Sequence, residues 1–230
     1  ILDGSTLSVG SLVNNGGTFL FNSGTLNVTG PAGLTIGSAG PLGATLEVDD
    51  DMTINATFGT TNQGLVTGDG QIGGTFANTA SGELRAEPGR SLKLTGASNT
   101  NAGQISLYGG MLDFTQNLTN NAGAFISGNG TLKVTTGLVN NGTMNFAGTA
   151  NIVGDVTNAA GGRIISGGGG ATIFYDDVTN NGEIRTSTNG FTVFFGSASG
   201  SGTYTGTGTV NFEGDLSPGS SPAAVSFAGD

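Results

Sequence analysis

The chain has 230 residues, of which 45 are glycine and 35% are apolar, and 16 acidic against 6 basic side chains give it a formal net charge of -10. Six scattered Lys and Arg side chains cannot neutralise a run of phosphates, which argues against nucleic acid as a partner. The sequence has no His and no Cys, which excludes Ser-His-Asp and Cys-His catalysis and leaves carboxylates as the only zinc ligands. No apolar run approaches the roughly 18 residues of a membrane span.

Short segments in which apolar and polar residues alternate recur from the N-terminus onward. Turn residues (Gly, Asn and Ser) separate them, and alternation over so few residues predicts strands. We expect pairs of apolar residues two positions apart to stack on one another as the core. These pairs are Leu26 and Val28, Leu46 and Val48, Leu92 and Leu94, Leu112 and Phe114, Leu132 and Val134, and Val210 and Phe212.

The segments return with a nearly constant period. Glycines that precede an apolar residue by two stand at positions 82, 103, 123, 142, 162, 182 and 202, and neighbouring positions differ by nearly the same amount each time. Three short strands per period of about 20 residues, with no helical pattern, predict a solenoid. We interpret the chain as all-β, a right-handed parallel β-helix (β-solenoid) of about ten turns. A leucine-rich repeat has a similar period, but its helix-forming half is missing.

The whole chain, residues 1–230, is predicted to form one solenoid domain. Residues 31–75 keep the period less regularly, and we expect Asp49–Gln63 to bulge from the rod as a longer loop. The regular turns span residues 76–214. A terminal segment with the sequence LSPGSSP follows in residues 215–230.

An asparagine follows an apolar residue by two at one corner of most repeats, as in LVNNG and VTNNG. Asparagine suits turn conformations, and its amide both donates and accepts hydrogen bonds. We therefore expect these side chains to stack inward as a ladder that satisfies backbone groups at the corner; the alternative is a row of ligand-binding amides. The residues are Asn14, Asn78, Asn101, Asn120, Asn140, Asn158 and Asn180.

Carboxylates are the remaining candidates for chemistry. The run Asp49, Asp50 and Asp51 is expected to be a solvated loop, with a calcium site as the alternative, so Ca²⁺ is the one cofactor left open. Parallel β-helices also include pectin-degrading enzymes, which use clustered Asp, or calcium with a basic residue. A carbohydrate-active enzyme would need a groove in which Asp176, Asp177 and Arg185 face a polysaccharide. We expect no catalytic residue in this chain.

The C-terminal stretch GDLSPGSSPAAVSFAGD, after repeats such as GTLKVTTGLVNNGTMNF, resembles the solenoid passenger regions of autotransporter-like bacterial surface proteins and of exosortase-sorted (PEP-CTERM-type) exoproteins. In those proteins a segment like L-S-P-G-x-S-P-G closes a block of turns; Ala223 stands at its final glycine here. The resemblance covers most of the chain in style. It implies a secreted or cell-surface location and a scaffold, adhesin or matrix role.

The sequence therefore predicts a non-catalytic extracellular structural module. Its expected partners are other copies of itself or cell-surface and matrix glycans or proteins, with neither nucleic acid nor a membrane span involved. Two alternatives remain: a self-assembling extracellular filament subunit, and a carbohydrate-active enzyme or glycan-binding module.

Overall fold

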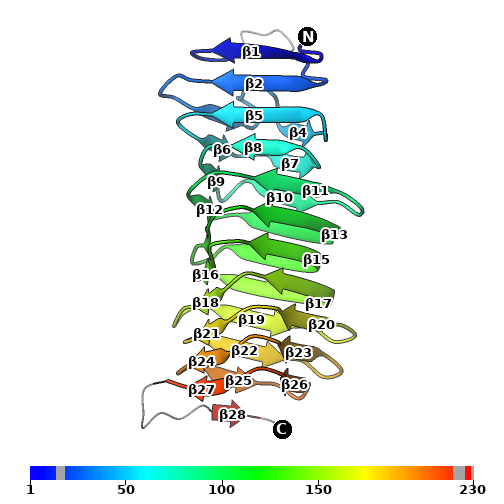
Figure 1. The fold of residues 1–230 in the computed structure, drawn as a ribbon, viewed down its shortest axis with the longest axis vertical. Coiled ribbons are helices and arrows are strands. Elements are labelled where there is room, and N and C mark those ends of the chain that lie inside the picture. The colour runs from blue at the N-terminus through cyan, green and yellow to red at the C-terminus, as the bar shows by residue number, and fades with distance from the viewer. Residues whose placement is uncertain (14–18, 220–225, 229–230) are drawn as a thin grey trace.

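The computed structural model describes residues 1–13, 19–219 and 226–228, and all its regular secondary structure is strand. The strands stack into an elongated rod whose turns follow one another from the N-terminal to the C-terminal end (Figure 1). Every strand pairing in this part of the chain is parallel, and one period separates each of the register partners Leu84, Ile105, Ile126, Met144, Ile164 and Ile184 from the next. The predicted β-solenoid of about ten turns is confirmed.

Each regular turn contributes a strand to each of three faces, in the order A, B, C. Face A contains β4 (Thr45–Val48), β7 (Leu65–Gly68), β10 (Glu83–Ala86), the first halves of β13 (Gln104–Phe114), β15 (Phe125–Val134) and β17 (Thr143–Val153), then β19 (Arg163–Ser166), β22 (Glu183–Thr186), β25 (Thr203–Thr205) and β28 (Ser226–Ala228).

Face B contains β1 (Ser5–Val9), β2 (Gly24–Val28), β5 (Met52–Ala56), β8 (Gln71–Gly73), β11 (Ser91–Leu94), the second halves of β13, β15 and β17, then β20 (Ala171–Phe174), β23 (Phe191–Phe194) and β26 (Thr209–Phe212). Faces A and B form one 18-stranded sheet, because β13, β15 and β17 run through the corner between them.

Face C is a separate 10-stranded sheet of three-residue strands. Its members are β3 (Leu34–Ile36), β6 (Thr60–Asn62), β9 (Phe76–Asn78), β12 (Asn99–Asn101), β14 (Leu118–Asn120), β16 (Leu138–Asn140), β18 (Val156–Asn158), β21 (Val178–Asn180), β24 (Ala198–Gly200) and β27 (Leu216–Pro218). The first and third residues of most of these strands point inward and are buried, while the middle one faces outward.

The predicted core pairs point into the rod, but two of them are shifted along their columns. Leu26 is in register with Ile54, and through Ile72 its column continues to Leu94, not to Leu92. The Leu132 column continues through Ile152, Phe174 and Phe194 to Phe212, so Val210 is not its last member. In both columns the observed register differs from the predicted one by two residues. A shift of two residues keeps the same side of a strand inward, so the alternation of apolar and polar residues cannot distinguish the two registers.

Leu46 and Val48 also differ from the prediction. They lie in β4 on face A, in register with Val66 and Gly68, whereas Leu26 and Val28 lie on face B. Pairs of buried apolar residues two positions apart occur on both faces, so the motif by itself does not say which face a pair occupies. Apart from the half-buried Val210 and Phe212, the predicted core residues are buried.

The prediction that Asp49–Gln63 bulges as a longer loop is wrong. Within it, β5 and β6 are regular members of faces B and C, and Ile54 is fully buried. The turn that departs from the period instead contains residues 37–44, which connect β3 to β4 without regular strand. That segment explains why more than one period separates Leu26 from its register partner Ile54.

Candidate functional site

The corner between faces C and A contains a continuous ladder of buried asparagine side chains. Each Nδ2 except that of the last member donates a hydrogen bond to the Oδ1 of the asparagine one turn further on, over 2.7 to 2.8 Å. The seven side chains are at most 2% exposed. The members are Asn62, Asn78, Asn101, Asn120, Asn140, Asn158 and Asn180.

The same amides also satisfy the backbone of the corner. Asn140 Nδ2 donates to the carbonyl oxygen of Arg163 over 3.2 Å, and Asn180 Oδ1 accepts a hydrogen bond from the Gly182 amide over 3.2 Å. The chain approaches itself closely here, and a Cβ at Gly162 would overlap the Asn140 carbonyl oxygen. Buried and engaged on both sides, these amides serve the backbone geometry of the rod.

Two positions qualify the asparagine prediction. Asn62 belongs to the ladder but was not predicted. It lies in the Asp49–Gln63 segment that was expected to bulge, and the residue two before it is the buried Thr60 where most repeats have an apolar residue. The spacing of Asn62 from Asn78, 16 residues, was the available signal. Asn14 lies outside the described residues.

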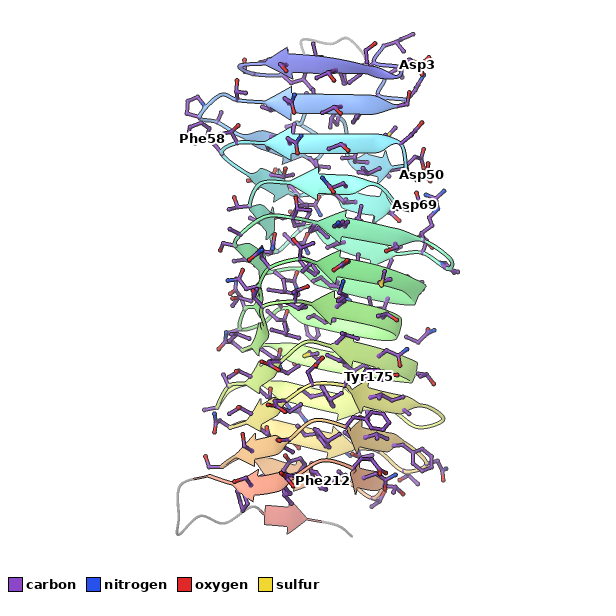
Figure 2. All side chains as sticks on the ribbon, in the orientation of Figure 1. Asp3, Asp50, Phe58, Asp69, Tyr175 and Phe212 are labelled. Atoms are coloured by element: carbon purple, nitrogen blue, oxygen red, sulfur yellow. The ribbon has the colours of Figure 1, made fainter. Side chains whose placement is uncertain are left out.

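The predicted acidic run sits at the corner between faces A and B near the N-terminal end. Asp3, Asp50 and Asp69 lie along one edge of the rod there (Figure 2). Arg90 forms ion pairs with Glu47 and, over 3.5 Å, with Asp49. The pKa of Asp49 is raised, mainly because partial burial disfavours its charged form and secondly because Glu47 carries a like charge. The positive charge of Arg90 opposes this shift. Within the described ranges, no three or more carboxylates come together as a metal would require.

The acids of the enzyme alternative lie at another corner, between faces B and C. Asp176 Oδ2 accepts a hydrogen bond from the Gly154 amide over 2.6 Å, and Asp177 Oδ1 accepts one from the Ser197 amide over 2.8 Å. Both carboxylates therefore link neighbouring turns through the backbone.

Arg185 is not near this corner. It lies in β22 on face A, where its neighbour Glu183 pairs with Arg163 over 2.8 Å. A hydrogen bond from the Thr205 hydroxyl, and then Arg163, holds the pKa of Glu183 below its usual value. Since face A and the corner between faces B and C belong to different sides of the rod, the fold does not bring Asp176, Asp177 and Arg185 into one groove.

One surface hollow lies beside these acids. It has a volume of about 350 Å³ and is lined by Lys133, Thr135, Val153, Gly154, Asp155 and Asp176. Next to it on face B, Tyr175 and Phe195 are 45% and 52% exposed, and their rings stack with centroids 5.6 Å apart. The sequence alone does not reveal this surface, because its residues come from several turns.

Comparisons with protein-family models, curated proteins and solved structures gave no match. No helix long and apolar enough to cross a membrane occurs in the described part of the chain.

Proposed function

We propose that this chain is a non-catalytic structural module of the bacterial cell exterior, a stiff rod that holds other parts or partners at a fixed separation. The asparagine ladder carries the proposal. It joins seven consecutive turns from Asn62 to Asn180 through buried side chains, beside an apolar core that runs the length of the rod. A buried network in which every member is engaged resists local bending, because any opening leaves polar groups unpaired.

The distribution of charge supports a scaffold. None of the ten strands of face C contains a charged residue, so the charged residues of the chain lie elsewhere. Face C thus offers a long surface of small, uncharged side chains such as Thr119, Thr157 and Thr179. The resemblance of the repeats to bacterial surface proteins supports the exterior location.

The stiffness can be measured directly, because the chain has no cysteine of its own. Spin labels at Thr61→Cys and Ser217→Cys lie on the outward column of face C, eight strands apart. At about 4.8 Å per strand their backbones are separated by roughly 38 Å. We expect pulsed electron paramagnetic resonance to give one narrow distance distribution near this value. A broad distribution would contradict the rod.

Two further measurements test the role. Incubation with soluble polysaccharides should release no new reducing ends; release that disappears in Asp176→Asn or Asp177→Asn would establish an enzyme instead. Antibodies to the chain should label intact cells of the source organism. Labelling only after permeabilisation would overturn the exterior location.

A further inference from the structure

Face B carries a file of outward side chains that changes character along the rod. On β11, β13 and β15 this file consists of Lys93, Asp113 and Lys133, with Lys133 Nζ 3.1 Å from Asp113 Oδ2. The backbone pairing then continues the file through Val153 to Tyr175 and Phe195. The surface therefore passes from paired charges to exposed aromatic rings.

A second row of outward side chains on face B lies beside the first and widens its apolar section. Ile173 and Val193 are in register with each other, and Asn151 and Asn211 occupy the positions on either side of them. We call the five residues Val153, Ile173, Tyr175, Val193 and Phe195 the aromatic strip. Tyr175 donates a hydrogen bond from its hydroxyl to Asn151 Oδ1 over 3.2 Å, which orients its ring at the surface (Figure 2).

Hydrogen-bond acceptors lie directly beside the strip. In the adjoining hollow, Asp176 is held through Oδ2 by Gly154, and Asp155 Oδ1 accepts from the Asp177 amide over 3.3 Å. Within the described residues, each of these carboxylates keeps its other oxygen for an incoming donor. Carboxylate oxygens form strong hydrogen bonds with hydroxyl groups.

We propose that the aromatic strip and this hollow bind a linear polysaccharide of uncharged sugars that lies along the rod. The proposal rests on the proposed function and names one of its partners. A sugar unit presents apolar C–H surface together with several hydroxyl groups, and here apolar ring atoms stand beside fixed carboxylate acceptors. The files repeat once per turn, about 4.8 Å apart, which is comparable with the length of one sugar in an extended chain.

The negative charges near the strip favour an uncharged polysaccharide over an acidic one. Asp155, Asp176, Asp177 and Asp215 lie at the corner between faces B and C on one side of the strip, Glu213 follows Phe195 in its file, and Lys133 is paired with Asp113. An acidic polysaccharide would bring its carboxylates against these five and be repelled. A folded protein is a poorer occupant, since stable protein interfaces use about 20 to 30 residues on each side and the strip has five.

Affinity electrophoresis through native gels tests the proposal, with hydroxyethylcellulose and glycol chitin as uncharged polymers and polygalacturonate as the acidic one. The double variant Tyr175→Ala/Phe195→Ala removes the rings. Tyr108→Ala/Phe125→Ala is the matched control, because Tyr108 and Phe125 are 52% and 49% exposed and lie outside the strip. All four side chains are at the surface, so both variants should unfold thermally as the unchanged chain does.

We expect at least one uncharged polymer to retard the chain, the strip variant to bind roughly tenfold more weakly, and the control to bind as before. Absence of retardation in both uncharged polymers, equal retardation in polygalacturonate, or equal loss in the control would each overturn the proposal. A narrow spin-label distance together with absent retardation would refute the glycan site and leave the rod intact. Release of reducing ends would refute the non-catalytic role even if binding were found.

Discussion

Replacing Asn140 with alanine tests the ladder at its centre. Asn140 is fully buried, accepts a hydrogen bond from Asn120, and donates to Asn158 Oδ1 and to the Arg163 carbonyl oxygen. Alanine fits the space but leaves the Asn120 N–H and the Asn158 oxygen without their partner. A buried donor or acceptor left unsatisfied costs about 1 to 3 kcal/mol, so the two together predict a loss of about 2 to 6 kcal/mol.

The neighbouring Asn141 supplies the control. Its side chain is half-buried at the same corner, and no side-chain hydrogen bond to it is seen among the described residues. Asn141→Ala should therefore change the free energy of unfolding by no more than about 0.5 kcal/mol. Urea unfolding followed by circular dichroism measures both variants.

For a chain of this size, a loss of about 2 kcal/mol corresponds to a melting midpoint lower by at least about 4 °C. The double variant Asn120→Ala/Asn140→Ala should lose less than the sum of the single variants, because both remove the same hydrogen bond. Equal unfolding free energies for the Asn140 and Asn141 variants would refute the reasoning that the ladder stabilises the rod.

Leu132→Asp should abolish cooperative unfolding or sharply lower the melting midpoint, because an unpaired charge in the fully buried column costs several kcal/mol. Thr131→Asp, on the outer side of the same strand, should change the melting midpoint little. Equal melting curves for the two variants would disprove the assigned sides of β15. Gly162→Ala should destabilise far more than Gly161→Ala, since a Cβ meets backbone oxygen at the first and open space at the second, and equal midpoints would contradict the close packing of the corner. Burial raises the pKa of Tyr204 from 10.0 to about 12, so its contribution to stability is present below pH 10 and is lost as the pH rises to 12. Urea unfolding across this range should show a smaller decline for Tyr204→Phe, and an identical decline would rule out the tyrosine as its source.

Much of the fold could be predicted from the spacing of small motifs. The period of the glycines before Leu84, Ile105 and Met144 matches the register of face A, and the asparagine corner matches the observed ladder from Asn78 to Asn180. These motifs are informative because each residue type does one thing: glycine permits close approach of two turns, and asparagine satisfies corner backbone.

The candidate surface site was beyond such reasoning. Tyr175 and Phe195 belong to different turns, and alternation only says that they point away from the core. Their stacking, and their position beside Asp155 and Asp176, depend on which turn lies against which and in what register. The groove that the enzyme alternative would need, with Asp176, Asp177 and Arg185 together, could not be judged from the sequence for the same reason, because closeness in sequence does not specify the face of the rod.

The sequence by itself determined that the chain is a solenoid, because stacked turns are the arrangement in which a repeated set of short strands buries its apolar residues. It also determined the asparagine corner. Only the tertiary structure decided that Leu26 aligns with Leu94, that Leu46 lies on face A, and that the aromatic strip adjoins an acidic corner. The physical reason is the two-residue symmetry of a β-strand: shifts of two keep every apolar side chain inward, and packing between whole turns selects among them.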